Sequence, residues 1–127
     1  MKRWSLIGQN GQSALPMTAA ILRASTENGA VWDDPSEDML FILLEDVQRG
    51  DESRFVDERL ADASGQTYIQ VIQDGLGGWT VERREGGPER HFTVTVPDLR
   101  QAHAAMTTWA FELPLVPPAA AWSRLTI

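Results

Sequence analysis

The sequence of 127 residues contains no cysteine and a single lysine, Lys2. The absence of cysteine excludes disulfide bonds and thiolate metal sites, and it is typical of proteins from a reducing compartment. Long hydrophobic runs are also missing, and the apolar stretch near the N-terminus is shorter than the hydrophobic region of a secretory signal. Together, these absences predict a soluble, cytoplasmic protein.

Positive charge is scarce as well. The chain has 11 Lys and Arg residues against 18 Asp and Glu residues, which gives a net charge of −7 and an isoelectric point near 4.7. Binding to nucleic acid or to an anionic membrane needs a cationic surface, so both functions are disfavoured. An acidic surface instead steers basic molecules toward the chain. The partner that the charge favours is therefore a protein, and a basic one in particular.

Length and composition predict a single compact domain over residues 1–127. With 43% apolar and 23% charged residues, the chain has the balance of an ordinary globular protein. Residues 1–17 show no sustained periodicity of apolar and polar residues. We interpret them as a leader or as a short edge strand over Arg3–Ile7.

The segment that follows predicts a β-hairpin. Residues 18–26 favour a strand, and the dipeptide Asn28-Gly29 favours a two-residue turn into a short returning strand over 30–32. A helix over 17–25 is the competing interpretation, because that segment is rich in good helix formers.

Two segments carry the start and stop signals of helices. The first begins at Asp34, which can cap a helix, and at Pro35, which is favoured at the first helical position. It stops at Gly50, which can adopt the left-handed cap conformation. The second begins at Asp98 as its cap and extends to Leu113, beyond which prolines forbid a helix. Each segment has an apolar stripe at helical spacing, so each is expected to pack one face inward.

Between these helices lie four segments with strand character. The first covers 54–61 and alternates imperfectly. The other three are alternating runs within 67–96, TYIQVIQDGLGGWTVERREGGPERHFTVTV, joined by two glycine-rich breaks. Parallel strands need long crossovers, so these short connections predict an antiparallel meander. The predicted fold class is α+β: an antiparallel sheet with two helices on one face, an N-terminal hairpin and a short C-terminal strand or tail.

Strand alternation divides the side chains of the meander between two faces. The apolar face is expected to join the apolar stripes of the helices in a core. The predicted core consists of Leu40, Leu43, Leu44, Val47, Val56, Leu60, Ile69, Val71, Trp79, Val81, Phe92, Val94, Leu99, Met106, Trp109 and Leu113.

We predict that the polar face of the meander is the contact surface for a protein partner. Tyr and Arg side chains are typical anchors of protein interfaces, and this face combines them with Gln and Glu. A polar face that is merely solvated is the competing interpretation. Arg59 and His91 are placed at the margins of the surface. The predicted binding residues are Tyr68, Gln70, Glu82, Arg84, Arg59 and His91.

Sequence motifs for catalysis, cofactors and metals are absent. No HExxH, GxSxG or calcium-loop pattern occurs. The glycines of DGLGGW lead into a strand and no lysine follows them, unlike a phosphate-binding loop, so they predict a hairpin turn. We therefore predict neither a cofactor nor a metal ion.

The function class that these observations favour is a non-enzymatic protein-binding module. His103 lies at the edge of a helical stripe and is interpreted as structural, and His91, at the start of a strand, as a surface residue. Two alternatives stay open. One is a small hydrolase or isomerase that uses His91 with Glu82 or Glu89, and the other is a structural subunit that forms a homodimer through the polar face.

The order of motifs also resembles a group of small bacterial proteins. FILLEDV is followed by GQTYIQV, by WTVERREGGPERH, by a helix that ends in Trp and by a final Trp. This order, over Trp32–Ile127, is similar to that of proteins of the Imm1-like immunity type, which occur in neighbourhoods similar to those of toxin-immunity proteins. The resemblance implies an immunity-type inhibitor, and it carries over no catalytic residues.

Overall fold

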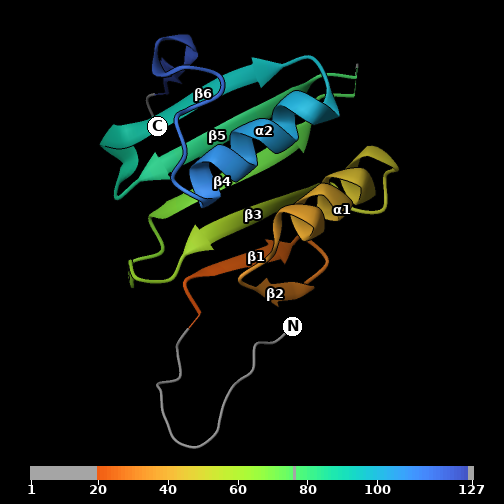
Figure 1. Cartoon of the computed structure of the whole chain (residues 1–127), viewed down its shortest axis with the longest axis horizontal. Coiled ribbons are helices and arrows are strands. Elements are labelled where there is room, and N and C mark those ends of the chain that lie inside the picture. The colour runs from red at the N-terminus through yellow and green to blue at the C-terminus, as the bar shows by residue number, and fades with distance from the viewer. Residues whose placement is uncertain (1–19, 76, 126–127) are drawn as a thin grey trace, which may run out of the picture.

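The structure, a computed structural model, describes residues 20–75 and 77–125. The predicted leader over 1–17 and its strand over Arg3–Ile7 lie outside the described residues. Along the described chain (Figure 1) the elements are β1 (Leu22–Thr26), β2 (Val31–Asp33), α1 (Glu37–Gln48), β3 (Arg54–Arg59), β4 (Thr67–Gln73), β5 (Trp79–Glu85), η1 (Pro88–Arg90), β6 (His91–Val96), α2 (Leu99–Ala110), η2 (Ala119–Ala121) and β7 (Ser123–Arg124).

The strands of the described residues join in one antiparallel sheet with the order β2-β1-β3-β4-β5-β6-β7. The strands from β3 to β6 follow one another as a meander. The hairpin extends one side of this meander through the pairing of β1 with β3, and β7 extends the other side by pairing with β6. The α+β class, the antiparallel sheet and the short C-terminal strand are confirmed.

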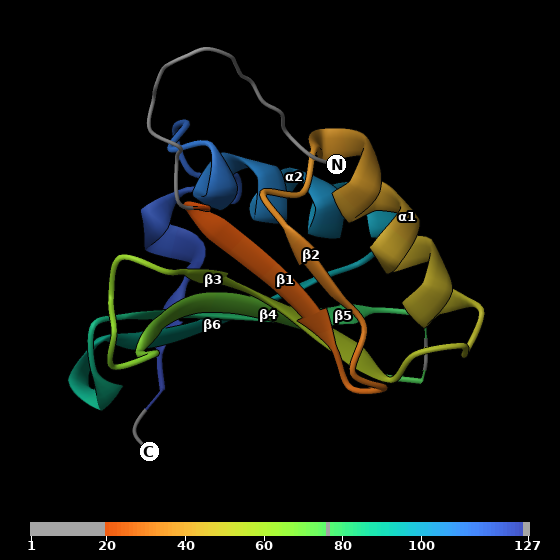
Figure 2. The same ribbon diagram turned by 90° about the horizontal axis from the view of Figure 1, so that it is seen from below.

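Both helices cover the same face of the sheet (Figure 2). α1 lies over β3 and β4, α2 lies over β4 and β5, and the two helices pack against each other. Trp79 and Phe55 are the largest fully buried side chains of the core between these layers. In the part of the chain that the structure describes, neither helix is long and apolar enough to cross a membrane.

The N-terminal hairpin forms as a pair of strands. Leu22–Thr26 is β1, so the strand interpretation of this segment is correct and the helix interpretation is wrong. The N–H of Thr26 donates to the carbonyl of Ala30 over 2.9 Å, so the loop has three residues instead of the predicted two. Gly29 takes a φ of 95°, a left-handed conformation that glycine adopts without steric cost.

The N-cap of α1 is Ser36, where the sequence predicted Asp34. Ser36 Oγ accepts a hydrogen bond from the N–H of Met39 at 3.1 Å. Asp34 Oδ1 instead accepts the backbone N–H groups of Ile21 and Leu22, each at 2.9 Å. The prediction was wrong by two residues because Asp34 connects the start of β1 to the chain before the helix, and serine caps a helix equally well.

The other helix boundaries agree more closely with the sequence. Gly50, just after α1, has the expected left-handed φ of 88°. Asp98 is the N-cap of α2 and accepts a hydrogen bond from the N–H of Gln101 at 2.9 Å. α2 ends at Ala110, earlier than predicted, and Leu113 therefore lies beyond the helix with 53% of its surface exposed.

Val56, Leu60 and Leu113 are the predicted core residues that the structure places outside the core. β3 directs Phe55 and Asp57 toward the helices, so alternation turns Val56 to the opposite face. Leu60 follows the end of β3 and is only partly buried. The remaining predicted core residues are buried (Leu40, Leu43, Leu44, Val47, Ile69, Val71, Trp79, Val81, Met106 and Trp109) or pack half-buried against the core (Phe92, Val94 and Leu99).

Asp57 places an ionisable group inside this core. It is fully buried on β3 between Ala24 and Ile69 of the neighbouring strands, and its carboxylate oxygens have no hydrogen-bond partner among the described residues. Burial raises the pKa of Asp57 to about 7, and the positive charge of Arg59 opposes the rise. Sequence reasoning left Asp57 out of the core because it assigned Val56 to the core face of the strand, and alternation then turns Asp57 to the opposite face.

Replacement of Trp79 by Ala should lower the free energy of unfolding by about 3–5 kcal/mol, because it empties the largest buried position of the core. Leu113→Ala changes an exposed side chain and is the control; it should alter the same free energy by less than about 0.5 kcal/mol. Urea denaturation followed by circular dichroism measures both. Equal losses in the two variants would contradict the packing described above.

Replacement of Asp57 by Asn should stabilise the protein more at high pH than at low pH. Because the pKa of Asp57 is raised, the folded chain holds a proton that the unfolded chain releases, and stability falls as the pH rises from about 4 to about 7. Asn does not ionise, so the stability of the variant does not fall with pH for this reason. The gain in unfolding free energy from urea denaturation should be about 2–3 kcal/mol larger at about pH 8 than at about pH 5. A gain independent of pH would show that Asp57 does not titrate in this way.

Candidate functional site

We call the face of the sheet opposite the helices the open face. Paired residues of neighbouring antiparallel strands point to the same side of a sheet, so the side chains of this face form rows. Two adjacent rows cross its centre: Arg23, Glu58, Tyr68, Arg84 and His91 in the first, and Ser25, Val56, Gln70, Glu82 and Thr93 in the second. The division of the meander into an apolar and a polar face is confirmed.

Glu82 is the centre of a hydrogen-bonded network on the open face. Its Oε1 accepts a hydrogen bond from Gln70 Nε2 on β4 at 3.0 Å. The same oxygen lies 3.1 Å from His91 Nε2 on β6. The side chain of Glu82 is 21% exposed, so the network reaches the molecular surface.

His91 is the buried part of this network. The sequence suggested a surface position, and that interpretation is wrong, because the residue is only 1% exposed. The sheet continues past β6, where the N–H of Leu125 donates to the carbonyl of His91 at 2.7 Å. On the other side the ring of Tyr68 packs edge-on against the imidazole, with 6.2 Å between the ring centres.

Both ring nitrogens of His91 take part in hydrogen bonds. Arg84 Nε, which can only donate, lies 3.0 Å from Nδ1, so Nδ1 is an acceptor and carries no proton. The proton of the neutral ring is then on Nε2, which donates to Glu82 Oε1. A catalytic histidine needs a nitrogen that can reach the proton it transfers, and this arrangement engages both.

Arg84 is held in place by neutral groups. In addition to the bond to His91, its Nη1 donates to Gln66 Oε1 at 2.5 Å. The guanidinium carbon lies 5.8 Å from the centre of the Tyr68 ring, on the strand paired with it. Sequence reasoning missed Gln66 because it lies just before β4, outside the alternating run, where no pattern distinguishes it from a loop residue.

Arg59 is the predicted site residue that does not lie on the open face. It projects toward the helices, where its Nη2 donates to the carbonyl of Trp109 at 2.5 Å and its guanidinium lies 4.4 Å from the centre of the Trp109 ring. A cation at this place caps the C-terminal end of α2 and has a structural role. The other predicted site residues, Tyr68, Gln70, Glu82, Arg84 and His91, lie together.

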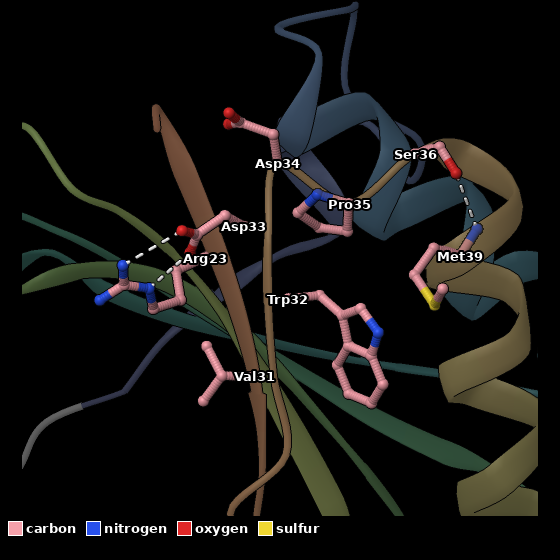
Figure 3. Close-up of a pocket in the computed structure, with 8 residues that line it drawn as sticks. All are labelled: Arg23, Val31, Trp32, Asp33, Asp34, Pro35, Ser36 and Met39. Carbon is pink, nitrogen blue, oxygen red and sulfur yellow. Dashed lines mark hydrogen bonds and ion pairs between the residues drawn. The ribbon is translucent and has the colours of Figure 1, made fainter. Parts of the chain in front are cut away.

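A pocket of about 500 Å³ lies elsewhere, between the β1–β2 hairpin and the start of α1 (Figure 3). Trp32 and Met39 lie on the side of β2 that faces α1, whereas Arg23 and Asp33 form an ion pair of 2.7 Å on its other side. Ser36, which also lines the pocket, caps the helix. These polar groups support the hairpin and the helix, and none of the predicted binding residues lines the pocket.

Groups of three or more His, Asp or Glu side chains that could hold a metal ion do not occur within residues 20–75 and 77–125. Comparisons with protein-family models, with curated proteins and with solved structures give no match for this chain. The similarity to immunity proteins in motif order therefore stays a prediction.

At about pH 8, nitrogen NMR should show His91 as the neutral tautomer with its proton on Nε2, since Arg84 Nε donates to Nδ1. Replacement of Arg84 by Met removes that donor and should let the Nδ1–H tautomer appear, while the signals of His103 stay unchanged. A proton on Nδ1 of the wild-type ring would contradict the network.

Proposed function

We propose that this protein is a non-enzymatic protein-binding module and that it binds its partner with the centre of the open face. The contact surface consists of Tyr68, Gln70, Glu82 and Arg84, and the supporting residues are Gln66 and His91. The observation that carries the proposal is the hydrogen-bonded network, which fixes polar side chains on a half-exposed face of the sheet.

Side chains that are already ordered favour association. A long polar side chain that loses its rotamer freedom at an interface costs about 0.5–1.5 kcal/mol. Gln70, Glu82 and Arg84 each have a hydrogen-bond partner within the network, so their orientation is set before a partner arrives. A face built in this way loses less free energy on binding than an ordinary polar surface does.

Tyr68 and Arg84 are the side chains that we expect to anchor the partner. Both residue types are enriched among the positions that dominate binding energy in protein interfaces. They pair across β4 and β5, the strands that lie under the helices. On the opposite side of the same strands, Val71 and Val81 are fully buried, so a packed core supports the backbone of the anchor residues.

An enzyme that uses His91 has less support. Glu82 lies within hydrogen-bond distance of the ring, as such an enzyme requires, but the ring is buried and Arg84 occupies its only unprotonated nitrogen. Glu89, the other carboxylate considered, is exposed in η1. A homodimer would use the same face, and mass measurements over a range of concentrations separate it from binding to a different protein.

Net charge supports a basic partner. A chain of net charge −7 attracts a cationic protein over long range, and this attraction speeds the encounter. Salt should therefore lower the association rate more than it raises the dissociation rate. An immunity-type inhibitor, which binds a toxin to block it, is the form of this function that the motif order favours.

The proposal is tested by affinity capture from the native host, followed by calorimetry with the captured protein after its purification. Three forms of the chain are compared: the wild type, Tyr68→Ala, and Ile42→Ala as the control. Ile42 is an exposed apolar residue on α1, on the helix side of the sheet. Its replacement therefore shortens a surface side chain and leaves the open face unchanged. Circular dichroism verifies that each variant folds.

Tyr68→Ala should weaken the affinity for the purified partner by about 2 kcal/mol or more, as expected for an aromatic anchor. Ile42→Ala should bind like the wild type. Wild-type affinity in a folded Tyr68→Ala variant would refute the proposal. So would the failure to find any partner other than a second copy of the chain.

A further inference from the structure

We propose that Arg84 binds a carboxylate of the protein partner, supplied by an Asp or Glu side chain at the centre of the partner's contact surface. The inference rests on the proposed function of the open face and names the chemistry that this face recognises. The observation behind it is the positive charge of Arg84, which hydrogen bonds orient but which no carboxylate of residues 20–75 or 77–125 contacts as an ion pair.

Besides Arg84, strands β1, β3 and β5 contain four arginines, and each of the four forms an ion pair with a carboxylate. These ion pairs are Arg23 with Asp33 at 2.7 Å, Arg54 with Glu27 at 3.8 Å, Arg59 with Glu112 at 3.6 Å and Arg83 with Glu85 at 2.9 Å. Arg84 is half-buried on β5 and has no carboxylate at ion-pair distance among the described residues. It is therefore the exception among the arginines of these strands.

Glu82 is the acidic residue on the same face of β5, two positions before Arg84, but its hydrogen bonds go to other groups. Its Oε1 accepts from Gln70 and from His91. The two acceptors that Arg84 does contact, His91 Nδ1 and Gln66 Oε1, are both uncharged. The hydrogen bonds of Arg84 thus fix its direction without neutralising its charge.

The geometry that remains suits a carboxylate. The bonds to His91 and Gln66 use the N–H of Nε and one N–H of Nη1, so the other N–H groups of the guanidinium can donate to a ligand. A planar guanidinium matches the two oxygens of a carboxylate, and such charge-assisted bonds are stronger than neutral ones. Arg84 is half-buried and its guanidinium lies beside the ring of Tyr68, and partial removal from water strengthens an ion pair formed there.

A carboxylate at this point is compatible with a partner that is basic overall. Net charge acts over several ångströms of solvent and governs the encounter, whereas the proposed contact acts at hydrogen-bond distance after the encounter. Phosphate-rich partners are disfavoured because the net charge of −7 repels nucleic acid and anionic lipid. An acidic side chain on a protein surface is the anion that can reach Arg84.

The first test uses the wild-type chain and acetate as the probe. The Nε–H signals of the arginines are followed by NMR during a titration with sodium acetate, and sodium chloride at equal ionic strength is the control. The Arg84 signal should shift to saturation with acetate only. The signal of Arg23, already paired with Asp33, should show no such saturation. An Arg84 response that chloride reproduces, or that does not exceed the response of Arg23, would overturn the inference.

The second test uses the purified partner. Arg84→Gln should weaken binding at least about tenfold, and Arg84→Lys should recover only part of the loss, because Lys keeps the charge and lacks the planar fork. Arg124→Gln, at an exposed arginine on β7, is the matched control and should bind like the wild type. If Tyr68→Ala weakens binding and Arg84→Gln does not, the proposed function stands and the carboxylate inference fails. If neither variant changes the affinity, both fail.

Discussion

The two-residue period of the antiparallel strands is the constraint from which both the core and the candidate site follow. Once the helices cover one face, every second side chain of the meander is directed into the core and its neighbours are directed away. Val81 is fully buried for this reason, and Glu82 and Arg84 share the opposite face for the same reason. The candidate site thus consists of side chains that the same alternation directs away from the core.

Sequence reasoning predicted the fold well wherever local signals agreed with one another. Three strands with clear alternation and short connections defined the meander, and Asp98 marked the start of α2 correctly. It was wrong where the local pattern was ambiguous. In β3, Phe55 and Val56 are adjacent, and each shares its face of the strand with two charged residues. The pattern is therefore equally consistent with either face, and the structure buries Phe55 in the core.

Sequence reasoning predicted which residues share the open face, but it did not predict the hydrogen bonds among them. Alternation placed Tyr68, Gln70, Glu82 and Arg84 together. It could not show that His91 is buried, because local alternation does not reveal the contacts of its ring with Tyr68, Arg84 and Glu82. Arg59 was misplaced for a related reason, since only the three-dimensional position of the α2 terminus explains why an arginine is directed inward.

The short strands at the two edges of the sheet disfavour self-association by strand pairing. In the described chain the sheet ends in β2, of three residues, and β7, of two residues. Strands this short offer a neighbouring chain little backbone with which to pair, so the sheet is a poor template for fibre growth. A protein that displays one whole face of a sheet can in this way stay a discrete particle when it is abundant.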